Sequence, residues 1–313
     1  MRLWSRLRRR TFWTTGLYRT ATPGWPDGGR LIRTFGAGRL LRLPYAAHTQ
    51  ADPFVFVTDD RLYLFLEIVR ANRAGVIKAW SSADLDHWTA HGVVLGTATH
   101  LSYPNILRIG EETYLLPESK AAGGVTLYRF NAFPYGLTPM RRIVDGPVND
   151  PTPFRHGDHW YLFATTPAGL ELYVSDDILN APFRRHPIGV IEADIRHARC
   201  GGPILVRDGR LFRPAQDGRR RYGGSLDLRE IVTLTPTAYV ERAAGRAILP
   251  QDRFWNRAGG HHLSSVEFAG GTVYAVDGQG WEAFHHKFTG RIAMGLDRLR
   301  LLLAARHRIG ATP

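Results

Sequence analysis

One hairpin pattern recurs five times between residues 52 and 277. Each copy is an apolar run, a turn of Asp, Gly or Glu, and a second run built around an aromatic residue. The aromatics are spaced 51, 47, 51 and 62 residues apart: Tyr63, Tyr114, Tyr161, Phe212 and Tyr274. A repeat of this length with strand patterning is typical of a β-propeller, in which each copy supplies the inner half of one blade.

Further alternating stretches follow four of the hairpins and predict the outer strands of their blades. We therefore expect an all-β chain folded as a five-bladed β-propeller over residues 46–285. Residues 1–45 are expected to be a basic N-terminal segment leading into the propeller. Residues 286–313 are expected to form a short basic amphipathic helix, whose apolar face holds Ile292, Leu296, Leu299 and Leu303.

The net charge of +13 is concentrated at the two ends of the chain. Residues 1–20 carry +6 and residues 286–313 carry +5, which leaves +2 for the remainder. A nearly neutral propeller is not expected to bind nucleic acid specifically. The basic ends predict peripheral contact with an anionic membrane, although a helix packed on the propeller would have the same pattern. With Cys200 as its single cysteine and no apolar signal segment, we expect a cytoplasmic protein at the inner face of the membrane.

The hairpin geometry selects a ring of polar residues. In an antiparallel pair, residues equidistant from the turn lie opposite each other, so the two ends of each hairpin share one blade edge. The same offset of 15 separates Asp52 from Glu67 and Tyr103 from Glu118. Five such edges around one axis are predicted to gather seven residues: Asp52, Glu67, Tyr103, Glu118, Asp150, Asp217 and His262.

Several segments resemble the N-terminal domain of plant glucosamine inositolphosphorylceramide transferase and its bacterial relatives. The most specific pair is His100-Leu-Ser-Tyr-Pro and, further on, Pro117-Glu-Ser. Other matching segments are Phe12-WTTGLYR, Ala51-DPFVF, Leu62-YLFLE, Leu115-LPES, Val148-NDPTPF, Arg199-CGGPIL and Phe212-RPAQD. In the plant proteins this domain precedes a separate glycosyltransferase domain, so the transferase name is not carried over to this chain, and the resemblance implies a partner glycosyltransferase as one option.

More distantly, the chain is similar to the five-bladed arabinanases, levansucrases and invertases of glycoside hydrolase families 43, 32 and 68. This resemblance implies that Asp52, at the start of the first blade, is the nucleophile or general base. It implies that Asp150 is the second, orienting carboxylate. The third position falls near Arg199, where the sequence has no glutamate, and Glu118 is the candidate that replaces it as the acid.

The sequence thus predicts a carbohydrate-active enzyme that cleaves or transfers a glycosyl unit of a glycan or glycolipid with a carboxyl pair. The predicted substrate-binding residues are Glu67, His100, Ser102, Tyr103, Arg199, Gln216, Asp217 and His262, with Tyr103 stacking on a sugar ring. No cofactor is expected; a metal held by His261 and His262 is a weaker alternative. The alternative function is a non-catalytic glycan-binding propeller that assists a separate glycosyltransferase, and an interaction scaffold ranks last.

Overall fold

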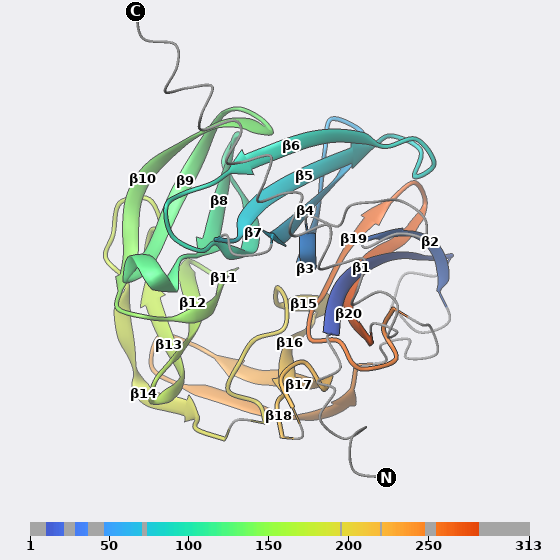
Figure 1. Ribbon diagram of the computed structural model, residues 1–313. Coiled ribbons are helices and arrows are strands. Elements are labelled where there is room, and N and C mark those ends of the chain that lie inside the picture. The colour runs from blue at the N-terminus through green and yellow to red at the C-terminus, as the bar shows by residue number, and fades with distance from the viewer. Residues whose placement is uncertain are drawn as a thin grey trace, which may run out of the picture.

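The computed structural model describes residues 11–21, 29–36, 47–70, 74–194, 196–219, 221–247 and 255–281. It contains five four-stranded antiparallel sheets arranged as blades around a central axis (Figure 1). The predicted five-bladed β-propeller is therefore confirmed. The C-terminal helix expected over residues 286–313 lies outside the described residues. Within the described part of the chain, no helix has the length and apolar character needed to cross a membrane.

Four blades follow one another along the chain. The first comprises β3 (Ala47–Thr58), β4 (Arg61–Arg70), β5 (Val76–Ser82) and β6 (Thr89–Leu95). The second comprises β7 (Ser102–Ile109), β8 (Glu112–Glu118), β9 (Gly124–Ala132) and β10 (Tyr135–Asp145), with a 3₁₀ turn, η2 (Lys120–Ala122), between β8 and β9. The third comprises β11 (Asn149–His156), β12 (His159–Thr166), β13 (Gly169–Ser175) and β14 (Arg184–Glu192). The fourth comprises β15 (Leu205–Arg207), β16 (Arg210–Asp217), β17 (Ser225–Leu234) and β18 (Tyr239–Arg246).

The fifth blade joins the two ends of the described chain. It comprises β19 (Leu263–Phe268), β20 (Gly271–Trp281), β1 (Thr11–Thr20) and β2 (Arg30–Phe35), in that order. Ten residue pairs connect β1 to β20. Residues 11–35 therefore contribute two strands to the propeller, and the expectation that residues 1–45 only lead into it is corrected. The physical reason is that the hairpin β19–β20 needs outer strands, which the N-terminal strands supply.

Apolar side chains fill each junction between neighbouring blades. Successive residues of a strand point to opposite sheet faces, so a blade buried on both faces needs apolar residues at nearly every position. The pattern of β4 shows this, since Leu62, Leu64, Phe65 and Leu66 are fully buried. Five core clusters form, one between each pair of adjacent blades. This packing fixes the blades relative to one another and leaves the inner strand ends to meet near the axis.

Candidate active site

Three inner strands share the same backbone feature near their first residues. In each, a residue with a positive φ precedes a proline: Asp52 (φ 48°), Tyr103 (φ 48°) and Asp150 (φ 49°). The register of each hairpin shifts at this point, so the pair occupies a β-bulge. Bulges redirect side chains away from the ladder, and a positive φ is uncommon and strained for a residue other than glycine. The bulge turns these three residues toward the axis.

The bulge also corrects the predicted register by one residue. Ala51, and not Asp52, pairs with Glu67, and Ser102, and not Tyr103, pairs with Glu118. The equidistance rule assumes a regular ladder, and the additional residue of a bulge breaks it. The predicted neighbours still meet, because the displacement is local to the strand end.

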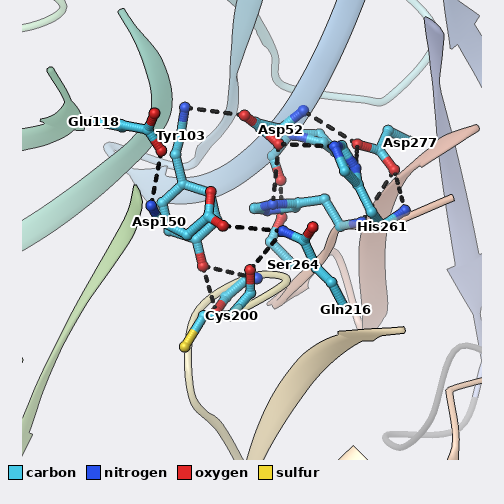
Figure 2. A network of polar contacts seen from close by, with 12 residues as sticks. Asp52, Tyr103, Glu118, Asp150, Cys200, Gln216, His261, Ser264 and Asp277 are labelled. Carbon is cyan, nitrogen blue, oxygen red and sulfur yellow. Dashed lines mark hydrogen bonds and ion pairs between the residues drawn. The ribbon is translucent and has the colours of Figure 1, made fainter. Parts of the chain in front are cut away.

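Five buried carboxyl groups gather around the axis: Asp52, Glu67, Glu118, Asp150 and Asp277. Burial raises the pKa of Asp52 well above its usual value, and the negative charges of the other four carboxyl groups add to this effect. Each of these groups acts on Asp52 through its charge, so the structure brings the three predicted catalytic residues, Asp52, Glu118 and Asp150, into one electrostatic cluster. Figure 2 shows Glu118 and Asp150 on one side of this network and Asp52 and Asp277 on the other.

Asp150 is held as an ionised partner of Arg199. The Arg199 guanidinium donates from Nε to Asp150 Oδ2 at 2.6 Å and from a terminal nitrogen to Oδ1 at 3.0 Å. Gln216 Nε2 donates to Asp150 Oδ2 at 3.1 Å and to the Cys200 carbonyl at 2.8 Å. A two-point pair of this kind fixes both the charge and the orientation of a carboxylate. Arg199 and Gln216, predicted to bind substrate, therefore bind Asp150.

Glu118 is a carboxyl group suited to hold a proton near neutral pH. Its Oε2 accepts a hydrogen bond from the Asp150 backbone N–H at 2.8 Å. Burial, and next the negative charge of Asp150, raise the pKa of Glu118 from 4.5 to about 7. Arg199 opposes this shift but does not cancel it. In enzymes, a carboxyl group with a pKa near 7 beside a carboxylate that is fixed by an ion pair commonly acts as the general acid.

Two predicted sugar contacts are buried inside the protein. The Tyr103 side chain is fully buried, and its hydroxyl bonds to Thr152 Oγ1 at 2.8 Å and to the Gly202 carbonyl at 2.9 Å. His262 is also fully buried, and burial lowers its pKa to about 3. Tyr103 therefore braces the second blade against the third and fourth, and the expectation that it stacks on a sugar ring is wrong. The prediction that His262 binds substrate is likewise corrected, because the packing of blades leaves its ring no open side.

The remaining predicted residues lie at three places, and Asp217 is not among the carboxyl groups that act on Asp52. His100 pairs with Glu67 through Nε2 and Oε1, 2.9 Å apart, and is partly exposed. Asp217 pairs with Arg219. Arg219 lowers the pKa of Asp217 to about 2. Burial raises this pKa, but its effect is smaller than that of Arg219. Ser102 is buried in the strand pair with Glu118.

Sequence reasoning missed the residues that line the other side of Asp52. Asp277 ends the fifth hairpin at the same offset of 15 from His262 that singled out Glu67 and Glu118. That offset was the signal for Asp277. Trp13 stacks on His261, with ring centroids 4.3 Å apart, and Tyr222 bonds to the same imidazole. Both lie outside the hairpin repeat, so the repeat could not locate them.

One group of three described residues, Asp52, His261 and Asp277, has its ligand-type atoms within 4.8 Å of one another. His261 Nδ1 lies only 2.5 Å from Asp277 Oδ2. Two ligands at about 2.1 Å from a tetrahedral zinc ion would lie roughly 3.4 Å apart. The short separation therefore fits a direct ion pair and not two ligands of one zinc ion.

Comparison with known proteins gives one family match. The family model described as "Glucosamine inositolphosphorylceramide transferase 1, N-terminal" matches residues 19–279. Glucosamine inositolphosphorylceramide transferase 1 of Oryza sativa subsp. japonica is 31% identical over 250 residues, which cover 75% of this chain and 34% of the relative. The protein of the same name from Arabidopsis thaliana is 30% identical over 277 residues, covering 82% and 36%. The chain thus spans about a third of the length of these relatives.

Solved structures share the fold at low sequence identity. CoXyl43, a GH43 β-xylosidase/α-arabinofuranosidase from a compost microbial metagenome, matches with a TM-score of 0.55 and 14% identity, covering 74% of this chain and 90% of that one. An α-L-arabinofuranosidase from Clostridium thermocellum matches with a TM-score of 0.52 and 17% identity, covering 72% and 80%. At these identities the likeness establishes the propeller fold and nothing about chemistry.

Proposed function

This chain belongs to the family of glucosamine inositolphosphorylceramide transferase 1 N-terminal domains, and from that premise we propose that its central carboxyl cluster acts on a carbohydrate. The proposed reaction is the cleavage or transfer of a glycosyl unit of a glycoconjugate. The names of the relatives support a sugar-containing substrate, since they are named as glucosamine inositolphosphorylceramide transferases, and the neighbours in fold are named as glycosidases.

The observation that carries the proposal is the pairing of a protonated carboxyl group with an ionised one inside a buried cluster. Glycosidic cleavage needs one carboxyl group that protonates the leaving oxygen and a second that attacks the sugar or activates water. Glu118, with its pKa raised to about 7, is proposed as the acid. Asp150, held by Arg199, is proposed as the orienting carboxylate.

Asp52 is proposed as the nucleophile or base. Burial and its four acidic neighbours disfavour its ionised form in the folded protein. The transition state of glycosidic cleavage carries positive charge on the sugar ring, and a positive charge beside Asp52 favours the carboxylate. The backbone N–H of Tyr103, which donates to Asp52 Oδ2 at 3.2 Å, stabilises the same ionised form.

The test is turnover of 4-nitrophenyl α-L-arabinofuranoside and β-D-xyloside, together with 4-nitrophenyl glycosides of other sugars, by the full chain. Asp52→Asn and Glu118→Gln are each expected to lower kcat by roughly 10²–10⁴-fold, because each removes a proton-transfer or attacking group. Glu112→Gln is the control, since Glu112 lies at the far end of the strand β8 that ends at Glu118. Unchanged turnover in both site variants would overturn the assignment.

One observation favours the second candidate, a glycan-binding propeller without catalysis. Gly202 opens the fourth hairpin, and a Cβ atom there would lie 1.9 Å from the Leu263 carbonyl oxygen. The fourth blade therefore has no room for an acidic side chain at this position. Sugar binding measured by calorimetry, without turnover of any glycoside, would support this alternative. In either case a partner glycosyltransferase is part of the proposal.

A further inference from the structure

Tyr222 begins a chain of three polar side chains that the proposed acid and base do not use. It lies in the loop between β16 and β17, with 52% of its surface exposed, and its Oη is 2.7 Å from His261 Nε2. On the other side of the same imidazole, Nδ1 lies 2.5 Å from Asp277 Oδ2. A phenol, an imidazole and a carboxylate are thus connected in series.

Asp277 determines which imidazole nitrogen carries the proton. Burial favours its neutral form, but His261 outweighs burial and the pKa of Asp277 is lowered. Its Oδ1 accepts the backbone N–H groups of His261 at 2.8 Å and His262 at 3.0 Å, which fixes the carboxylate. An ionised carboxylate only accepts hydrogen bonds, so His261 Nδ1 bears the hydrogen. Nε2 is then left as the acceptor for the Tyr222 hydroxyl, as in serine–histidine–aspartate triads.

The surrounding residues hold this arrangement in place. The buried His261 ring stacks on Trp13 at an interplanar angle of 22°. Gly223, next to Tyr222, has a φ of +68°, and a Cβ atom there would lie 2.2 Å from the Trp13 ring. Only glycine allows the loop to approach Trp13 this closely. The fifth blade therefore positions both His261 and the loop that carries Tyr222.

Tyr222 faces the carboxyl cluster. The Arg199 guanidinium carbon lies 5.3 Å from the centre of its ring. His261 Nε2, the partner of the Tyr222 hydroxyl, lies 3.9 Å from Asp52 Oδ1. Figure 2 shows His261 and Asp277 beside Asp52. The charged groups that act on Tyr222 from the surrounding blades are Asp52, Arg199, Asp150 and Glu67.

We propose that Tyr222, His261 and Asp277 form a proton relay in which Tyr222 is a catalytic residue that activates a hydroxyl group of the acceptor sugar or of water. The relay rests on the proposed function with Asp52 as the nucleophile: Asp52 attacks the sugar first, and the oxygen that the relay activates then displaces Asp52 from it. The acceptor O–H bond breaks as Tyr222 Oη takes the proton, and the original phenolic proton passes to His261 Nε2. Asp277, a positioning residue, stabilises the resulting imidazolium. Glu118 protonates the leaving oxygen, and the imidazolium proton returns to Glu118 through solvent.

The chain offers a matched control for this relay. Tyr135 is 48% exposed, and its Oη is also 2.7 Å from an imidazole nitrogen, Nδ1 of His91. The other nitrogen of His91 lies 2.9 Å from the Ser81 hydroxyl and not from a carboxylate. The two tyrosines therefore match in exposure and in their histidine contact. They differ in the group that contacts the second nitrogen of the histidine, which is a hydroxyl for His91 and a carboxylate for His261.

The experiment measures the rate of tyrosine O-acetylation by N-acetylimidazole in the full chain, mapped by peptide mass spectrometry. We expect Tyr222 to react at least about tenfold faster than Tyr135, because a positioned base accelerates loss of the phenolic proton. Asp277→Asn should bring Tyr222 to the rate of Tyr135 or below, with Tyr135 unchanged. The asparagine oxygen can still accept the two backbone N–H groups, while its amide would drive the imidazole hydrogen to Nε2.

Equal rates for the two tyrosines, or a fast Tyr222 in Asp277→Asn, would overturn the relay. The comparison is sharp because the pKa of Tyr222 is raised, first by desolvation of its hydroxyl, which contacts the buried His261 although the residue as a whole is half exposed, and next by the negative charge of Asp52. Without a base, Tyr222 would therefore react more slowly than an ordinary exposed tyrosine. Nitrogen chemical shifts of the His261 ring provide a second test that needs no variant: a hydrogen on Nε2 would contradict the proposal. Neither measurement depends on turnover, so a relay without glycoside cleavage would overturn the proposed function alone.

Discussion

Glu118 illustrates how a single residue acquires its chemistry from its position. It ends β8 inside the carboxyl cluster, where burial and the charge of Asp150 both favour its protonated form. Arg199 lowers the pKa of Glu118 only partly, because that guanidinium is paired directly with Asp150. The residue type alone would predict a glutamate with an ordinary pKa.

This shift predicts a pH dependence of stability. Between about pH 4.5 and pH 7 the folded protein holds a proton on Glu118 that the unfolded chain has lost. Its contribution to the free energy of unfolding is therefore fully present below pH 4.5 and is lost as the pH rises through about 7. The total is at most roughly 3 kcal/mol, by the cost of one pKa unit.

Glu118→Gln should remove this contribution. Urea unfolding at about pH 5 and about pH 8 is expected to show a smaller loss of stability at high pH for the variant than for the wild type. Glu112→Gln, in the same strand, should keep the wild-type dependence. Identical pH dependence in Glu118→Gln and the wild type would contradict the assigned pKa.

The sequence located part of this residue-scale site. Asp52, Glu118 and Asp150 occupy repeated positions of the hairpins, so one fold hypothesis predicted that all three would meet. Tyr222 and Trp13 lie outside the repeat, in a loop and in an outer strand. Their approach to His261 depends on how the fifth blade closes, which spacing along the chain does not encode.

At the scale of the element, the tight turns and strand starts depend on a few backbone positions. Gly202 has a φ of +134° and its carbonyl accepts the Tyr103 hydroxyl. Any side chain there would meet the Leu263 carbonyl oxygen. The sequence places Gly202 at the start of the fourth hairpin, but it does not predict the contact with another blade that makes the glycine necessary.

Gly202→Ala is expected to lower the free energy of unfolding by more than about 3 kcal/mol, since it adds a backbone collision to an unfavourable φ. Gly209→Ala is the matched control, because Gly209 also has a positive φ (71°) but has no atom within 4 Å of the added Cβ. The control should cost only about 1 kcal/mol. Chemical denaturation of the two variants measures the difference. Equal losses of unfolding free energy would show that a small shift of the backbone removes the collision with Leu263.

At the scale of the whole molecule, charge and fold are separated along the sequence. Residues 21–285 carry +2 of the net +13, and the two ends carry the rest. We keep as a proposal that these ends bring a cytoplasmic protein to the anionic inner face of a membrane. Each basic residue near such a surface contributes about 1 kcal/mol.

The full chain is therefore expected to float with vesicles containing phosphatidylserine at low salt. It should remain unbound to neutral phosphatidylcholine vesicles, and roughly 0.5 M salt should release it, because ions screen the attraction. Removal of residues 286–313 should weaken the binding. If the full chain does not bind anionic vesicles, this proposal is wrong.

The pairing of β1 with β20 also has a consequence for how the protein is made. The paired residues are about 260 positions apart, and ribosomes add roughly 5–20 residues per second. β1 therefore leaves the ribosome tens of seconds before its partner exists, with Phe12, Trp13 and Leu17 lacking their final surroundings. Until then it presents an open strand edge that chaperones could protect. Because Trp13 belongs to β1, the site around His261 is completed only after β20 has been synthesised.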